Sequence, residues 1–173
     1  MKSSQSKKNT EFIKKDLESA IRVTSLAANG LIKMGESFGA NFSDCIDLLS
    51  NLNGRVVVSG MGKSGHVGNK IAATLASTGT QAFFVHPAEA SHGDLGMISE
   101  EDAVIALSNS GETKELSDLM SYTRRFNIPL IGITSVEDST LAENSDILIC
   151  LPDVEEAGPH GVPTTSTTLM ISL

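Results

Sequence analysis

The sequence predicts a doubly wound α/β domain, a three-layer sandwich around a five-stranded parallel sheet. Five apolar runs of five or six residues alternate with segments of helical periodicity. The runs are continuously apolar, which is typical of parallel strands buried on both faces. Fifteen glycines and few aromatic residues suit an α/β protein with tight strand-to-helix turns.

The N-terminal third precedes the sheet. Residues 1–9 are polar, and we expect them to form a disordered tail. From Thr10 apolar residues recur at helical spacing, which predicts one or two amphipathic helices over 10–35. A further helix is predicted over 42–52, ending before Gly54. The folded domain is therefore expected to span 10–173.

The strands and the remaining helices follow in alternation. The apolar runs are 55–59, 81–85, 103–107, 129–134 and 146–151. Helices are predicted over 64–78, 113–126 and 139–144. Residues 164–173 begin another helix after several hydroxyl residues, but no C-cap signal follows. We therefore expect this last helix to be cut short and the parent chain to continue beyond Leu173.

Composition excludes several classes of partner and location. A net charge of −8 and a pI near 4.9 argue against nucleic acid. Cys45 and Cys150 have no metal-type spacing and suit a reducing compartment. The N-terminus has no secretory h-region, and no apolar run approaches the ~20 residues of a membrane span. The sequence thus predicts a cytoplasmic protein without a membrane contact.

The first glycine-rich loop is Ser59-Gly-Met-Gly-Lys-Ser-Gly65, between a strand and a helix. It matches the dinucleotide fingerprint formally, but the second strand ends at His86-Pro87 and offers no acid for a ribose. A Walker A loop would need glycine where Val57 stands. What remains is a turn whose backbone N–H groups bind an anion at a helix start, with Gly62 and Ser64 as candidate ligands.

The second loop is Ser108-Asn-Ser-Gly-Glu-Thr113, which also follows an apolar strand and precedes a helix. It offers hydroxyl groups and an amide side chain, and its candidate phosphate ligands are Ser108, Asn109, Ser110 and Thr113. Loops at the carboxyl ends of parallel strands converge on one crevice. Two such loops therefore predict a single phosphate site.

These loops, together with Phe-Phe-Val-His-Pro-Ala-Glu-Ala-Ser-His-Gly-Asp-Leu-Gly-Met at 83–97, closely resemble the sugar isomerase (SIS) domain of arabinose 5-phosphate isomerases. The resemblance extends from about residue 12 to the end. It implies a flavodoxin-like SIS fold and interconversion of D-ribulose 5-phosphate and D-arabinose 5-phosphate through a cis-enediol. That reaction feeds 3-deoxy-D-manno-octulosonate and lipopolysaccharide synthesis. The resemblance further implies no cofactor, a homotetramer with shared active sites, and a pair of CBS domains after the isomerase domain.

The resemblance also assigns the catalytic residues. Lys63, His92, Glu115 and Glu156 match positions that the family's active site uses. Lys63 would stabilise the enediolate or the phosphate, His92 would serve ring opening or proton shuttling, and Glu156 would be the enediol base. The family also uses a histidine from beyond the last helix, contributed by a neighbouring subunit.

Metal is not expected to be required. His92, with His86 and Asp94, could form an adventitious zinc site, but the spacing matches no structural zinc motif. We expect His86, which precedes Pro87, to be structural.

Two alternatives remain at this point. One is a non-catalytic phosphosugar-binding module, as in regulators that share the fold. Such a module needs the second loop but has no use for Lys63, His92 and Glu156 together. The other is a related isomerase for a different ketose phosphate, because substrate length beyond the phosphate is not legible in the residues.

Overall fold

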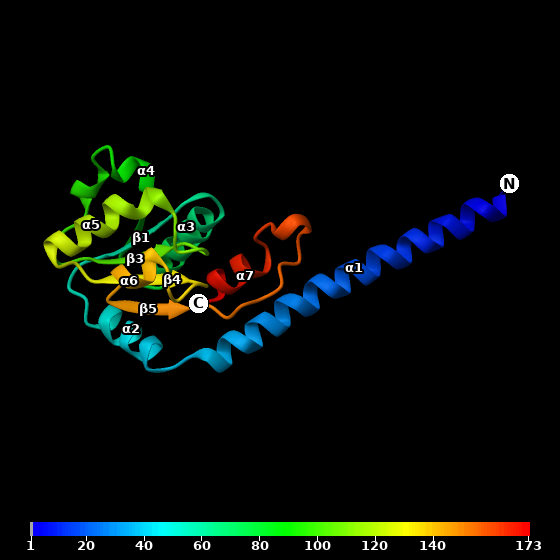
Figure 1. The fold of residues 1–173 in the computed structure, drawn as a ribbon, viewed down its shortest axis with the longest axis horizontal. Helices are drawn as coiled ribbons and strands as arrows, with labels where there is room; N and C mark the ends of the chain where they lie inside the picture. The colour runs from blue at the N-terminus through cyan, green and yellow to red at the C-terminus, as the bar shows by residue number, and fades with distance from the viewer. Residues whose placement is uncertain (1) are drawn as a thin grey trace.

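The computed structural model describes residues 2–173, with side chains from residue 11 onward. It confirms the doubly wound sheet (Figure 1). Five parallel strands stand in the order β2-β1-β3-β4-β5. Their bounds are β1 Val56–Gly60, β2 Ala82–Val85, β3 Ala103–Leu107, β4 Leu130–Thr134 and β5 Ile147–Cys150.

Successive strand residues point to opposite faces of the sheet, and both faces are apolar. Helices cover each face and bury these side chains. Val58, Ile105 and Ile133 face a core shared with α1, α2, α3 and α7. Val57, Val104 and Leu130 face the opposite core, which α4, α5 and α6 complete. The bounds are α1 Lys2–Ser37, α2 Ala40–Ser50, α3 Gly62–Ser77, α4 Pro87–Ala90, α5 Ser117–Phe126, α6 Thr140–Asn144 and α7 Thr165–Ser172.

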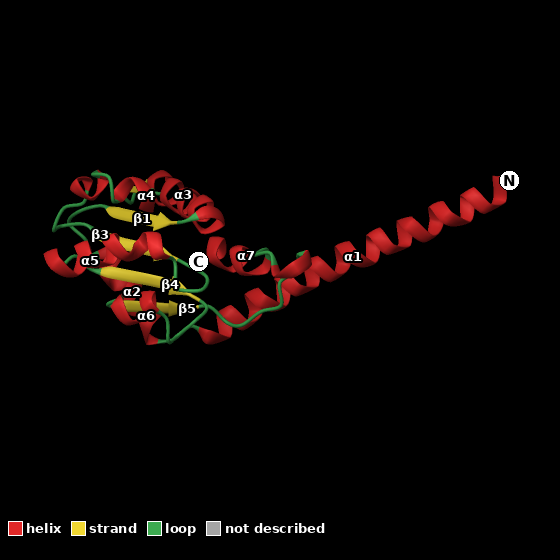
Figure 2. Ribbon diagram, turned by 45° about the horizontal axis from the view of Figure 1, so that its top comes forward, coloured by secondary structure: helices red, strands yellow, loops and turns green. Residues whose placement is uncertain are grey.

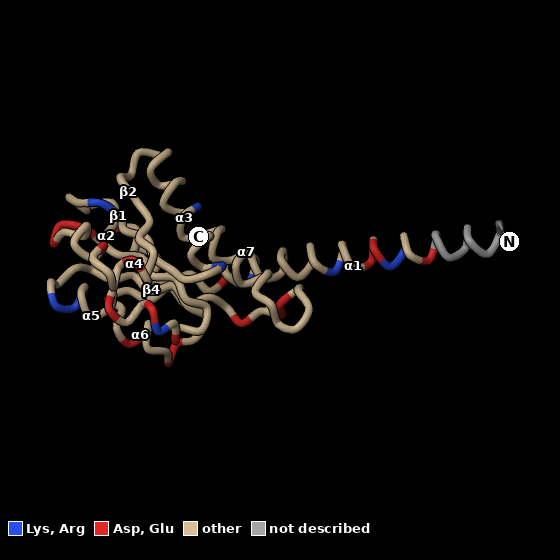
Figure 3. The backbone as a smooth tube through the Cα atoms, turned by 90° about the horizontal axis from the view of Figure 1, so that it is seen from above, with Lys and Arg blue, Asp and Glu red and all other residues tan. Residues whose placement is uncertain are grey.

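Helix α1 is a single long helix that extends away from the sheet toward the N-terminus (Figure 1). Charged residues of both signs lie along it (Figure 3) and form ion pairs between Lys14 and Glu18 and between Lys15 and Glu11. Its C-terminal half packs on α7. The sequence predicts a disordered tail over 1–9, whereas the backbone of residues 2–9 continues α1; the side chains of residues 1–10 lie outside the described ones.

Strand β5 is an edge of the sheet, and α2 covers it. The Asn41 amide donates a hydrogen bond of 3.1 Å to the Leu148 carbonyl of this strand. The edge therefore offers fewer unpaired carbonyls to another chain.

Three short 3₁₀ segments and α4 were not predicted. They are η1 Asp94–Met97, η2 Lys114–Leu116, η3 Pro159–Gly161 and the four-residue α4. Each is too short for a periodic apolar pattern, although Pro87 at the start of α4 is a local helix-start signal. The helix predicted over 113–126 begins as η2 and continues as α5.

The order of the strands creates a switch point. The chain moves from β1 to β2 on one side and then returns to β3 on the other side of β1. Open α/β sheets bind ligands in the crevice at such a point, outside the carboxyl ends of the strands. Figure 2 shows the arrowheads of the strands pointing toward the side where α7 lies. Of the helices in the described part of the chain, none has the length and apolar character to cross a bilayer.

At the opposite end of the sheet, Asp102 lies buried just before β3. Its carboxylate accepts hydrogen bonds from the backbone and side chain of Arg55 and from the Ser99 N–H. The Arg55 guanidinium also lies 4.7 Å from the centre of the Phe83 ring. Burial raises the pKa of Asp102, but the hydrogen bonds from Arg55 and Ser99 outweigh it and lower the pKa overall.

Asp102→Asn is therefore expected to lower the free energy of unfolding by about 2 kcal/mol at neutral pH, since an amide replaces a charged acceptor. The pKa of Asp102 in the folded state lies below its unfolded value of about 3.9. The stability contributed by the Asp102 carboxylate is therefore complete above pH ~3.9 and is lost as the pH falls through the folded-state pKa. Urea unfolding at pH 7 and at pH 3 measures it. The difference in free energy of unfolding between wild type and Asp102→Asn should be smaller at pH 3 than at pH 7.

Glu101→Gln is the matched control, because Glu101 is adjacent and exposed. Glu101→Gln should leave the free energy of unfolding unchanged. Equal stability of wild type and Asp102→Asn at pH 7 would contradict the role assigned to Asp102.

Candidate functional site

The first loop brings α3 directly against the end of β1. A Cβ atom at Gly65 would lie 2.6 Å from the carbonyl oxygen of Gly60, so only glycine allows this approach. Gly62 opens α3 with a positive φ of 58°. The first turn of α3 therefore directs its N–H groups toward the carboxyl end of the sheet, where they can bind an anion.

Besides Gly62, two further predicted residues, Lys63 and Ser64, lie in that first turn. Lys63 is exposed, and Ser64 is half-buried. The Ser64 hydroxyl lies 3.9 Å from the Met170 sulfur of α7. The loop after β1 and helix α7 therefore lie against each other at the carboxyl end of the sheet.

The second loop folds around its own hydroxyl groups. The hydroxyls of Ser108 and Thr113 lie 2.8 Å apart, and Ser108 is buried. The Gly111 N–H donates to the Ser108 carbonyl at 3.1 Å. The Ser110 hydroxyl accepts from the Glu112 N–H at 3.2 Å. This compact turn holds Ser108, Ser110 and Thr113 together beside the first loop, since Gly60 of β1 pairs with Leu107 of β3.

The predicted phosphate ligand Asn109 is held from outside the loop. Its side-chain oxygen accepts from the Ser135 hydroxyl at 2.9 Å, and its carbonyl accepts from the Ser135 N–H at 3.1 Å. The structure thus ties Asn109 to the segment after β4. Its backbone role is positional, and its phosphate role stays a prediction.

Glu156 lies on the start of α7. One carboxylate oxygen accepts from the N–H groups of Thr164 at 2.6 Å and Thr165 at 2.7 Å, and from the Thr164 hydroxyl at 3.1 Å. The Ser166 N–H approaches both oxygens at 3.4 Å. Burial raises the pKa of Glu156, but hydrogen bonds from Ser166, Thr164 and Thr165 outweigh it and lower the pKa. Glu156 is therefore ionised at neutral pH and caps α7 from a distance along the chain.

Glu155 has a different environment, although it is the next residue in the sequence. Its side chain is 72% exposed and lies 4.0 Å from Arg22 of α1. The two neighbouring carboxylates therefore differ sharply, and only Glu156 is bound by a helix start.

The remaining predicted residues lie on exposed segments. His92 stands between α4 and η1, and Glu115 lies in η2 just after the second loop. The elements around them meet, because α4 packs on both η2 and α5. His86 is structural as expected: its Nδ1 accepts from the Ala88 N–H at 3.3 Å and caps α4.

The structure groups the predicted residues into two sets. Lys63 and Ser64 lie in α3, and Glu156 binds the start of α7, which packs on α3. His92 and Glu115 lie on the α4–η2 side. Over residues 11–173 no hydrogen bond or ion pair joins the side chains of Lys63, His92, Glu115 and Glu156. Within that range there is also no group of three or more His, Cys, Asp or Glu side chains suited to a metal ion.

Sequence reasoning missed two sets of contacts. The carboxylate of Glu112, in the second loop, accepts from the N–H and hydroxyl of Thr140, and these bonds lower its pKa. Thr164, Thr165 and Ser166 bind Glu156. The run of hydroxyl residues before α7 was a signal for the second set, because such residues favour helix starts.

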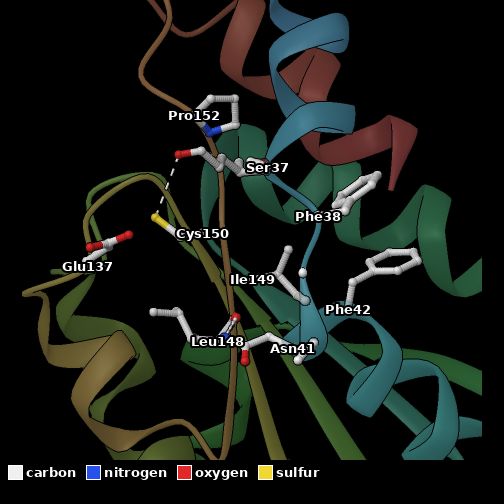
Figure 4. Close-up of a pocket in the computed structure, with 12 residues that line it drawn as sticks. Ser37, Phe38, Asn41, Phe42, Glu137, Leu148, Ile149, Cys150 and Pro152 are labelled. Carbon is white, nitrogen blue, oxygen red and sulfur yellow. Dashed lines mark hydrogen bonds between the residues drawn. The ribbon is translucent and has the colours of Figure 1, made fainter.

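A groove of ≈ 390 Å³ lies elsewhere, between the turn that joins α1 to α2 and the edge strand β5 (Figure 4). Phe38 and Phe42 stack at 4.5 Å on one side of it, and Glu137 and Cys150 lie on the other. The Cys150 thiol points to the Leu151 carbonyl at 3.7 Å, and its pKa is raised by burial and by Glu137. None of the predicted site residues lines this groove.

Comparison with known proteins gives consistent matches. Residues 48–173 match the SIS domain. The chain is 47% identical over 147 residues to the arabinose 5-phosphate isomerase KdsD of Salmonella typhi, covering 84% of this chain and 45% of that protein. It is 49% identical over 148 residues to the KdsD protein of Yersinia pestis, covering 85% of this chain and 45% of that protein. The chain thus spans about half the length of these curated relatives.

Among solved structures, the fold is similar to c3406 of E. coli CFT073, which was solved in complex with arabinose 5-phosphate. The TM-score is 0.85 and the identity 38%, and the match covers 91% of this chain and 85% of that chain.

Gly111→Ala is expected to disrupt the second loop. Gly111 has a φ of 69°, and a Cβ atom there would overlap the Ser139 hydroxyl oxygen. Left-handed strain and overpacking together predict a loss of about 3 kcal/mol in the free energy of unfolding. Urea unfolding measures it. Gly96→Ala is the control, since nothing lies within 4 Å of its Cβ position; equal effects of the two substitutions would refute the assignment.

Proposed function

The chain belongs to the SIS domain family, and we propose that it carries the isomerase activity of an arabinose 5-phosphate isomerase. The reaction interconverts D-ribulose 5-phosphate and D-arabinose 5-phosphate through a cis-enediol. One observation carries the proposal: two hydroxyl-rich anion loops lie side by side at the β1/β3 switch point, in a chain 47% identical to curated enzymes of that name.

The phosphate end of the substrate binds between the two loops. The first turn of α3 supplies N–H groups and the Ser64 hydroxyl, and the second loop supplies hydroxyls of Ser108, Ser110 and Thr113. Neutral donors and a helix start hold a phosphate without a broad basic surface. This explains how a protein of net charge −8 can take an anionic substrate.

The reacting carbons lie beyond the phosphate, toward Lys63 and the start of α7. Isomerisation moves a proton between C1 and C2, and a cation stabilises the oxygen charge of the enediolate. Lys63 supplies that cation, Glu156 accepts and returns the proton, and His92 with Glu115 serves ring opening. Contact between Ser64 and Met170 supports placing the first loop and α7 on one substrate.

The ionised state of Glu156 supports the base role. A base must be deprotonated before the reaction, and the hydrogen bonds from Thr164 and Thr165 keep the pKa of Glu156 low. The same bonds make the carboxylate a weaker base. The barrier for proton abstraction must then be lowered chiefly by charge stabilisation of the enediolate, which is the role given to Lys63.

We further propose that the protein is cytoplasmic, that it assembles as a homotetramer with active sites shared between subunits, and that its product enters lipopolysaccharide synthesis. Exposed apolar residues on α1 support the assembly. Ile13, Leu17 and Ile21 follow each other at four-residue spacing and are 54%, 59% and 64% exposed. A stripe of this kind marks a protein interface more often than a free surface. The two free cysteines support a reducing compartment.

The activity is tested by incubating the full-length protein with D-ribulose 5-phosphate and measuring D-arabinose 5-phosphate, with and without EDTA. We expect turnover in both conditions. Glu156→Gln should lower kcat by about 100-fold or more while substrate still binds, because the amide retains an acceptor for α7 but takes no proton.

Glu155→Gln is the matched control and should keep a near-wild-type rate, since Glu155 is exposed. Tight phosphosugar binding without turnover by the wild type would favour the non-catalytic module. Turnover of a different ketose phosphate alone would favour the related isomerase. A wild-type rate in Glu156→Gln would remove Glu156 from the base role.

The assembly is tested by light scattering. The double substitution Leu17→Glu and Ile21→Glu places charges on the exposed stripe and should yield a species smaller than the wild type. Ser19→Glu is the control, because two residues along a helix correspond to about 200° of rotation and place it on the other side. Equal masses for wild type and double variant would exclude the stripe as an interface.

A further inference from the structure

The second loop is attached to the segment after β4 through Glu112. Both oxygens of its carboxylate are engaged: one accepts from the Thr140 N–H at 2.7 Å, the other from the Thr140 hydroxyl at 2.8 Å. Thr140 is the first residue of α6 and lies 28 residues further along the chain. Glu112 therefore joins two segments that the sequence keeps apart.

This contact belongs to a larger attachment. The Gly111 carbonyl accepts from the Leu141 N–H at 3.0 Å, and Asn109 bonds to Ser135. Gly111 also packs directly against Ser139. The loop is thus fixed at its two ends to the β4–α6 segment, at Asn109 on one side and at Gly111 and Glu112 on the other.

The position of Glu112 is electrostatically unusual for a phosphate loop. It lies between Gly111 and Thr113, and a carboxylate beside a phosphate dianion is repulsive. Two donors from Thr140 bind the carboxylate and draw it toward the start of α6. Glu112 itself is exposed, so burial does not explain its presence. In the structure the Glu112 carboxylate fastens the second loop to the start of α6.

We propose that Glu112 is a positioning residue for the phosphate site, which sets the affinity for the phosphosugar by fastening the second loop to α6. The inference rests on the proposed function, in that the loop is taken to bind the substrate phosphate. Glu112 does not touch the substrate. It acts through the hydroxyls of Ser108, Ser110 and Thr113, whose mutual placement depends on the anchored turn.

Glu112→Gln should raise KM for the phosphosugar about tenfold and leave kcat within about twofold, the scale seen when supporting contacts around binding groups are lost at metal sites. The inhibition constant of inorganic phosphate should rise by the same factor, because the effect is confined to the phosphate end. Thr140→Val, which removes the hydroxyl donor, should act in the same direction. The double variant should be no worse than the more affected single variant, since both changes break one contact.

Glu143→Gln is the control, an exposed carboxylate in the first turn of α6. It should change neither KM nor the phosphate constant. Calorimetric titration of wild type and Glu112→Gln with D-arabinose 5-phosphate measures the affinity for the phosphosugar without turnover. The effect of the Glu112–Thr140 contact, the anchor of the second loop, is therefore tested even if the protein is not an isomerase.

Three outcomes would overturn the proposal. Unchanged KM and phosphate inhibition in folded Glu112→Gln would show that the anchor does not set affinity. A fall in kcat at constant KM would place Glu112 in the chemistry. Absence of any phosphosugar binding by the wild type would remove the proposed function together with this inference. Should Glu112→Gln fail to fold, Thr140→Val decides by the same measurements.

Discussion

The position of β1 between β2 and β3 is the constraint on which the site depends. Because the chain leaves β1 for one edge and later returns to its other side, α3 and α5 cover opposite faces. The loops that precede these helices consequently diverge, and in open α/β sheets this is where ligands bind. The close approach of Gly65 to Gly60 fixes the first loop at this point, and the pairing of Gly60 with Leu107 fixes the level of the second.

An acidic protein that is proposed to bind a phosphate must keep its own carboxylates away from that phosphate. Glu112 and Glu156 are each bound by donors at a helix start. The donors are Thr140 of α6 for Glu112, and Thr164 and Thr165 at the start of α7 for Glu156. Helix starts favour negative charge, so each carboxylate is stabilised where it stands. This arrangement leaves the first turn of α3 and the neutral hydroxyls of the second loop for the proposed phosphate.

Much of the fold was predictable because its signals are local. Five apolar runs identify the strands to within one or two residues, and their carboxyl ends place both loops correctly. The supporting contacts were not predictable, because they join distant segments. Nothing in the sequence pairs Glu112 with Thr140, and the contrast between Glu155 and Glu156 arises only when the segment before α7 folds back. The family resemblance supplied Lys63, His92 and Glu115, whose exposed positions alone would not single them out.

The capping of α7 has a consequence for the proposed reaction. If Glu156 takes a proton from the substrate, the neutral carboxyl becomes a weaker acceptor for the N–H groups of Thr164 and Thr165. Helix α7 packs between α1 and α3, with Leu169 and Thr165 against Gly30, so its start cannot move freely to find other acceptors. The protonated state of Glu156 is then disfavoured, and the proton is readily returned. Transfer of a proton between C1 and C2 of one sugar requires a base that takes the proton from one carbon and quickly returns it to the other.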